Sequence, residues 1–141
     1  MLPTPITLNH QTTNPYEAKY GYSRSVRRGP FIFVSGTTSI DLTTSQIQYP
    51  NSAHQQALTI FAEIIRAIEA VGGKKRDIVR VRMFVKFDED CDEVGRALKE
   101  TLGGDEEKSI PAVDPTATMI TGVRFVHPDM RVEIEAEALV M

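Results

Sequence analysis

Hydrophobic residues recur with helical spacing in two segments of the chain. Between Ala53 and Val71 they stand three or four positions apart, which is typical of an amphipathic helix. Gly72 and Gly73 follow this segment, and glycine readily adopts the left-handed conformation that ends many helices. From Asp88 to Leu102 a second segment begins with acidic residues, keeps the helical spacing and ends at two glycines. We therefore expect two helices.

Five other segments are rich in β-branched and aromatic residues or alternate between apolar and polar residues, as strands do. They are Tyr20–Arg28, Phe31–Gly36, Ile78–Phe87, Thr116–Arg124 and Arg131–Val140. Together with the helices they give the order β-β-α-β-α-β-β, which predicts an α+β fold: a single mixed β-sheet with two helices packed on one face. The opposite face of this sheet then lacks a cover, and this suggests an oligomer.

Residues 1–18 show no such periodicity and contain three prolines, so we expect an irregular N-terminal arm (1–18) followed by one domain (19–141). The formal net charge of −3 argues against broad binding to nucleic acid or to anionic membrane surfaces. The single cysteine cannot form an internal disulfide, and the N-terminus does not resemble a signal peptide. Both observations lead us to expect a cytoplasmic protein.

Sequence motifs for the common cofactors are missing. The chain has no glycine-rich nucleotide motif, no HExxH or paired-cysteine zinc motif and no EF-hand spacing, so we expect no metal and no cofactor. The three histidines have no spacing that places two of them on one face, and Cys91 lies among acidic residues that disfavour its thiolate. Four segments remain as candidates for a site: Tyr20–Arg24, Ser35–Thr38, Pro115–Met119 and Val132–Glu137.

Each of these segments also has an ordinary structural interpretation. The tyrosines of the first can pair across strands, and the third can consist of plain strand residues. The acidic residues of the last can form a solvated strand face that pairs with Arg80, Arg82 and Lys86 of a neighbouring strand. The second segment can be a simple turn, or its glycine, Gly36, can end a strand where backbone amides meet a ligand oxygen.

In order and spacing these segments resemble the Rid family of reactive-intermediate deaminases, also called YjgF-type or UK114-type proteins. The resemblance extends from about Tyr20 to Leu139. It rests on motifs that are individually short: Tyr22-Ser23, Phe33-Val34-Ser35-Gly36, Ala70-Val71-Gly72-Gly73, Phe84-Val85-Lys86 and Val132-Glu133-Ile134-Glu135-Ala136. The family implies a chorismate-mutase-like fold and a homotrimer with clefts between subunits. It also implies hydrolysis of small-molecule enamines or imines to a carbonyl compound and ammonia, with no metal or cofactor.

The resemblance assigns roles to single residues. Glu133 falls on the glutamate that positions the attacking water, and Thr118 falls on the small residue that follows the family's arginine. Tyr22 falls on the cleft tyrosine and Gly36 on the glycine of the second strand, with Thr37 beside it as a further substrate contact. We therefore expect Glu133 and Thr118 to be catalytic, and Tyr22, Gly36 and Thr37 to bind the substrate.

One position departs from the family pattern. Active deaminases of the family read Pro-Ala-Arg at the start of the penultimate strand, whereas this chain reads Pro115-Thr116-Ala117, so Ala117 stands where the carboxylate-binding arginine is expected. The chain is therefore similar to an arginine-lacking subgroup with an altered substrate. Arg24 can either reach the cleft and substitute for the missing arginine or lie exposed on its strand.

Three functions follow from the resemblance. The first is an imine or enamine deaminase whose substrate differs from that of the arginine-containing members. The second is a non-catalytic small-molecule-binding or regulatory trimer on the same scaffold. The third, an endoribonuclease or translation inhibitor, is disfavoured by the net charge of −3.

Overall fold

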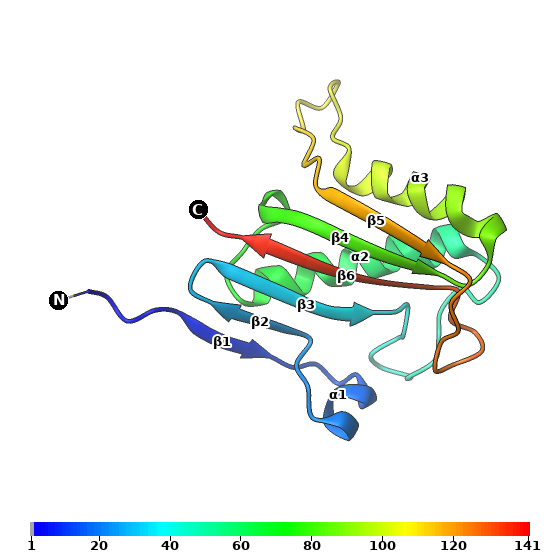
Figure 1. Ribbon diagram of the computed structural model, residues 1–141, viewed down its shortest axis with the longest axis horizontal. Helices are drawn as coiled ribbons and strands as arrows, with labels where there is room; N and C mark the ends of the chain where they lie inside the picture. Colours follow the sequence, from blue (N-terminus) through cyan, green and yellow to red (C-terminus); the bar gives the residue numbers. More distant parts are fainter. Residues whose placement is uncertain (1) are drawn as a thin grey trace.

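One mixed β-sheet of six strands carries the fold, and two long helices cover one of its faces (Figure 1). The computed structural model describes residues 2–141. The strands are β1 (Thr7–His10), β2 (Ser25–Arg28), β3 (Phe31–Thr37), β4 (Ile78–Val85), β5 (Thr116–Thr121) and β6 (Val132–Leu139). They lie in the order β1-β2-β3-β6-β4-β5, and all neighbours are antiparallel except β4 and β5, which are parallel. The predicted α+β fold is confirmed.

The two long helices lie where the hydrophobic spacing predicts them. They are α2 (Ala53–Ala70) and α3 (Cys91–Leu102). A short 3₁₀ turn, η1 (Lys75–Asp77), follows α2, and a second one, η2 (Asp88–Asp90), leads into α3. The Ser52 side chain caps α2 by accepting a hydrogen bond from the Gln55 amide, and Gly72, with φ of 89°, turns the chain away at the other end. Among the described residues no helix is long and apolar enough to cross a bilayer.

The two faces of the sheet differ as the alternation predicts. On the face toward the helices, β4 and β6 present buried apolar side chains: Val81, Met83, Val85, Val132, Ile134 and Ala136. On the opposite face, which we call the open face, Arg82 Nη1 lies 3.0 Å from Glu135 Oε1 and 3.3 Å from Glu137 Oε1. Arg80 Nη1 lies 3.8 Å from Glu137 Oε2. The predicted pairing of the acidic strand with arginines is confirmed, whereas Lys86 donates to a backbone carbonyl.

The N-terminal residues differ from the sequence-based expectation of an irregular arm over 1–18. Here β1 adds an edge strand that pairs antiparallel with β2, and a short helix, α1 (Pro15–Tyr20), follows it. The side chain of Asn14 caps this helix by accepting from the Tyr16 amide, and Pro15 occupies its first turn. Periodicity missed β1 because its four residues are almost wholly exposed and form a strand through backbone pairing alone.

The first predicted strand, Tyr20–Arg28, is also shorter than expected. Gly21 adopts a left-handed φ of 75° that ends α1, and its amide donates to the Glu17 carbonyl. Tyr22 and Arg24 consequently lie in the link between α1 and β2, and pairing with β3 begins only at Ser25. The two predicted site residues of this segment are therefore loop residues, not strand residues.

A buried ion pair fixes this link against the sheet. Glu17 and Arg24 are 1% and 2% exposed, and Arg24 Nε donates to Glu17 Oε2 over 2.9 Å. Glu17 also accepts from the amide and the hydroxyl of Thr12, each at 2.7 Å. On the other side, Arg24 Nη1 donates to the Gly36 carbonyl at 2.8 Å, so the pair ties α1 to the end of β3.

Replacing Glu17 by Gln should destabilise the protein strongly, because it leaves the buried Arg24 charge without its counter-charge. Loss of one partner of a buried pair costs about 3–5 kcal/mol. The free energy of unfolding, measured in urea for wild type and Glu17→Gln, tests this. The exposed pair between Arg66 and Glu63 is the control, since Arg66→Ala should cost less than about 1 kcal/mol. Equal losses in the two variants would contradict the structural role of the buried pair.

Candidate functional site

A pocket of about 160 Å³ opens where the α1–β2 link, the end of β3 and the start of β6 meet. Its wall contains most of the residues that the sequence singled out, together with two tyrosines of α1. The side chains and backbone that matter for chemistry are Tyr16, Tyr20, Tyr22, Arg24, Gly36 and Glu133. Residues far apart in the sequence thus form one small polar cavity.

Glu133 lines this pocket from the open face of β6. A Cβ atom built on Gly36 would lie 3.0 Å from Glu133 Oε2 and 3.1 Å from its Cδ, so the carboxylate lies directly against the backbone of β3. Position 36 is a glycine because a side chain there would contact Glu133, and not because its backbone is left-handed. Within residues 2–141 no side chain forms a hydrogen bond or ion pair with the Glu133 carboxylate. The carboxylate is therefore available to a ligand.

The surroundings of Glu133 raise its pKa above that of an exposed glutamate. Burial raises the pKa of Glu133, the nearby Arg24 charge opposes this rise, and the Glu135 carboxylate adds to it. A carboxylate with a raised pKa is a stronger base than an ordinary surface glutamate. Glu133 can accordingly take a proton from a water molecule or another ligand in the pocket.

Arg24 lines the pocket, and the alternative of an exposed strand arginine is wrong. Its guanidinium is held by Glu17, by the Gly36 carbonyl and by Thr37 Oγ1 at 3.1 Å. The remaining nitrogen, Nη2, lies 3.4 Å from the Tyr22 hydroxyl, and Cζ lies 5.7 Å from the centre of the Tyr22 ring. Arg24 therefore reaches the site, but Glu17 already neutralises its charge.

Three tyrosines form the aromatic part of the wall. Tyr16 and Tyr20 of α1 stack with ring centres 6.5 Å apart and an angle of 10° between their planes, and Tyr22 follows in the link. The sequence placed Tyr20 in a candidate segment but indicated only Tyr22 as a binding residue, and it did not single out Tyr16. Their i, i+4 spacing behind the cap signature Asn14-Pro15 was the available signal, because it places both rings on one face of a short helix.

The structure does not bring the other three predicted residues into this pocket of the same chain. Thr37 is buried, and its hydroxyl donates to the Ser35 carbonyl at 2.7 Å, so it supports Arg24 from behind. Ala117 and Thr118 are exposed on the edge strand β5, and β4 separates that strand from β6. Within one chain, only Tyr22, Arg24 and Gly36 of the predicted binding residues adjoin Glu133.

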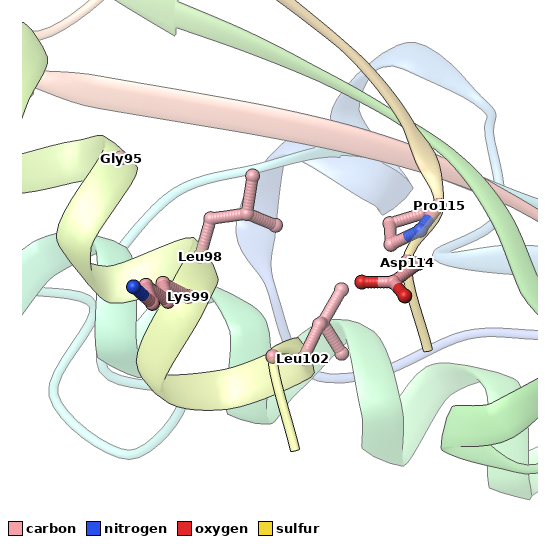
Figure 2. A pocket seen from close by; sticks show the side chains of 7 residues that line it. Gly95, Leu98, Lys99, Leu102, Asp114 and Pro115 are labelled. Atoms are coloured by element: carbon pink, nitrogen blue, oxygen red, sulfur yellow. The ribbon is translucent and has the colours of Figure 1, made fainter. Parts of the chain in front are cut away.

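A second cavity, of about 350 Å³, lies between α3 and the segment before β5 (Figure 2). Leu98 and Leu102 extend from α3 toward Asp114 and Pro115 on its far side. This cavity is larger and mostly apolar, and its two charged lining residues, Lys99 and Asp114, are exposed. We regard the smaller pocket as the candidate site because it holds Glu133. In the described part of the chain no three metal-binding side chains gather.

Comparison with known proteins relates this geometry to other chains. A family model described as "Endoribonuclease L-PSP" matches residues 12–140. The uncharacterized protein SCO2049 of Streptomyces coelicolor is 27% identical over 128 residues, which is 91% of this chain and 88% of that protein. A protein of Dermatophagoides farinae named 2-iminobutanoate/2-iminopropanoate deaminase is 25% identical over 115 residues, covering 82% of each chain.

Solved structures show the same fold. Rv2704 of Mycobacterium tuberculosis, described as a member of the YjgF/YER057c/UK114 family, superimposes with a TM-score of 0.80 and 27% identity, covering 96% of this chain and 100% of that one. The YjgF gene product of E. coli gives a TM-score of 0.75 with 25% identity, covering 97% of this chain and 98% of that one. The matched length and the fold agree, and the chain belongs to the Rid family of YjgF/YER057c/UK114 proteins.

Proposed function

We propose that this protein hydrolyses a small, reactive imine or enamine to a carbonyl compound and ammonia, without a metal or other cofactor. The observation that carries the proposal is the Glu133 carboxylate, which is half-buried, lies directly against Gly36 and has no hydrogen-bond or ion-pair partner among residues 2–141. The relative from Dermatophagoides farinae, named as an imine deaminase, supports the reaction class.

The proposed mechanism uses Glu133 as a base and as an acid. Its carboxylate takes a proton from a water molecule as the water oxygen bonds to the carbon of the protonated imine, R₂C=NH₂⁺, which gives the neutral carbinolamine R₂C(OH)NH₂. Glu133 passes that proton to the carbinolamine nitrogen and then takes the hydroxyl proton as the C–N bond breaks and the C=O bond forms. The leaving ammonia takes up this last proton and departs as NH₄⁺. An enamine first takes a proton on carbon and becomes the imine. One water is consumed, and Glu133 returns to its starting state.

Tyr22, Gly36 and Arg24 are the proposed binding groups around this carboxylate. The backbone beside Gly36 and the Tyr22 hydroxyl can hold the polar head of the substrate. Because Ala117 stands at the position of the family's carboxylate-binding arginine, and Glu17 already pairs with Arg24, we propose that this chain belongs to an arginine-lacking subgroup with an altered substrate. Thr37 acts in this proposal through Arg24, since the two side chains are hydrogen-bonded.

Ala117 and Thr118 enter the proposed site only through assembly. We place them in clefts of a homotrimer, where the edge strand β5 of one copy lies beside the Glu133 pocket of the next. The uncovered open face supports assembly, since it exposes Phe33 and Ile120 at 46% and 43%. In such a cleft Thr118 can hold the attacking water together with Glu133.

Two other functions have weaker support. A non-catalytic binding trimer remains the alternative, motivated by Ala117 and by the neutralised Arg24. Ribonuclease activity, suggested by the description of the family model, needs free cationic groups for phosphates. The arginines of the open face, Arg80 and Arg82, are instead paired with glutamates. We therefore favour the hydrolase.

Ammonia release from an imine generated in situ by an amine or amino-acid oxidase tests the activity. Wild-type protein should accelerate it, and Glu133→Gln should lower kcat by about 100-fold or more, because general bases contribute roughly 10²–10⁴-fold. Glu137→Gln, on the same strand and face, is the matched control and should retain activity. If wild type does not accelerate the hydrolysis of any imine tested, or if wild type and Glu133→Gln give equal rates, the binding trimer is favoured.

Gly36→Ala should lower kcat by roughly tenfold to 100-fold, because the added Cβ would lie 3.0 Å from Glu133 Oε2 and must displace the carboxylate. A double-mutant cycle with Glu133→Gln shows whether the effect passes through Glu133. In that background the alanine should cause little further loss. A full, additive loss would instead place the effect of Gly36 on another contact.

Light scattering coupled to size-exclusion chromatography should give a mass about three times 15.7 kDa. Phe33→Glu should yield smaller species, because it introduces a charge on the exposed apolar part of the open face. Leu2→Glu, at a side chain that is 91% exposed, is the control and should leave the mass unchanged. A monomeric wild type would exclude a site shared between copies.

A further inference from the structure

The charges around the Glu133 pocket do not cancel. Its two charged lining residues within the described chain are Arg24 and Glu133, and Arg24 is paired with the buried carboxylate of Glu17 at 2.9 Å. Among residues 2–141 Glu133 has no such partner. With both carboxylates ionised, Glu133 and the buried pair behind it together carry a net charge of −1, so a cation is favoured over an anion beside Glu133. Lys19, on the outer side of Tyr20, does not line the pocket.

The aromatic wall favours the same sign of ligand. The faces of tyrosine rings attract cations, and sites lined by several rings bind protonated or quaternary nitrogen. Two of these rings already carry a cation of the protein on one face: Lys19 Nζ lies 5.3 Å from the centre of Tyr20, and Arg24 Cζ lies 5.7 Å from that of Tyr22. A ligand cation would therefore use the other faces of these two rings. Tyr16, stacked on Tyr20, extends the aromatic surface.

Arg24 is the cationic lining residue, within the described chain, that could pair with a ligand carboxylate, and the protein already engages most of its guanidinium. Arg24 uses Nε for Glu17 and Nη1 for Gly36 and Thr37, which leaves only Nη2, directed at the Tyr22 hydroxyl. A carboxylate placed there would also lie close to Glu133, and two like charges in a half-buried site are destabilising. The pocket is therefore built against anionic ligands as well as for cationic ones.

We propose that the Glu133 pocket selects small molecules that carry a protonated nitrogen and no carboxylate, with Glu133 binding the charge and Tyr16, Tyr20 and Tyr22 surrounding it. This rests on the proposed function and names its substrate class: protonated imines, R₂C=NH₂⁺, derived from amines. Water converts such an ion to R₂C=O and NH₄⁺, so atoms and charge balance. The neutral carbonyl product loses its attraction to Glu133 and can leave.

The substrate class also fixes the kind of reaction that precedes this one. An imine without a carboxylate arises when a primary amine loses two electrons and a proton on carbon, that is, from an amine-oxidising enzyme. Oxidation of an amino acid instead gives a 2-imino acid, whose carboxylate this pocket disfavours. The protein accordingly acts on the product of amine oxidation.

Ligand binding tests the charge preference separately from turnover. The protein has no Trp, and three of its four Tyr line the pocket, so tyrosine fluorescence reports on the site. Benzyltrimethylammonium and benzoate are the probes, because they differ chiefly in the sign of their charge. We expect the cation to bind at least about tenfold more tightly. Equal affinity, or tighter binding of benzoate, overturns the proposal.

Variants separate the contributions of the carboxylate and the rings. Glu133→Gln should weaken cation binding by about tenfold and should leave benzoate binding unchanged or stronger. Tyr20→Leu should weaken cation binding by about threefold. It should not unfold the protein, because the Tyr20 side chain is 65% exposed. Glu137→Gln, already paired with arginines on the open face, is the control. Unchanged cation affinity in Glu133→Gln contradicts the assignment.

Turnover distinguishes failure of this inference from failure of the proposed function. The imine of benzylamine, made by an amine oxidase, is compared with 2-iminopropanoate, made from alanine by an amino-acid oxidase. A higher kcat/KM for the benzylamine imine supports both proposals. A higher kcat/KM for 2-iminopropanoate overturns the substrate class while the hydrolase stands. If the protein accelerates the hydrolysis of neither imine, the proposed hydrolase function is wrong. The affinities of the two binding probes then decide the charge preference by themselves.

Discussion

The buried pair between Glu17 and Arg24 organises the site on which every functional inference depends. Two ionised side chains, 1% and 2% exposed, face each other at 2.9 Å, and taking either charge out of water without the other would be costly. The pair holds because Thr12 and the Gly36 carbonyl occupy further hydrogen-bonding positions. In this way α1, which contributes few core residues, is fixed to the end of β3.

The pair also sets the electrostatic character of the pocket. By neutralising Arg24, Glu17 leaves Glu133 as the uncompensated charge, and burial then raises the pKa of that carboxylate. The close approach of Glu133 to Gly36 is possible because position 36 has no side chain. The buried ion pair and the absence of a side chain at Gly36 thus place the accessible Glu133 carboxylate against the backbone of β3. This arrangement suits both proton transfer and the binding of a cation.

The sheet gives this arrangement its rigidity. The strand β6 lies between β3 and β4, its alternate residues pack beneath α2, and Glu133 projects from the other side. The same geometry leaves the open face without helices, with arginine–glutamate pairs at its middle and Phe33 and Ile120 exposed. One scaffold therefore supplies both a firmly held catalytic candidate and a surface suited to assembly.

The periodic sequence by itself determined the main elements: α2, α3, β4 and β6 lie within a few residues of their predicted positions, because apolar spacing is a local property that the core then uses. Its resemblance to the Rid family also indicated Glu133, Gly36 and Tyr22 as candidates, and these three residues line one pocket. Only the tertiary structure decided that Arg24 is buried, that Tyr16 and Tyr20 complete the wall, and that Ala117 and Thr118 lie two strands from Glu133. These facts depend on the left-handed turn at Gly21, on the backbone pairing of the exposed strand β1 and on the order of the strands in the sheet. None of these three features produces a periodic pattern of apolar residues, so the sequence alone does not show them.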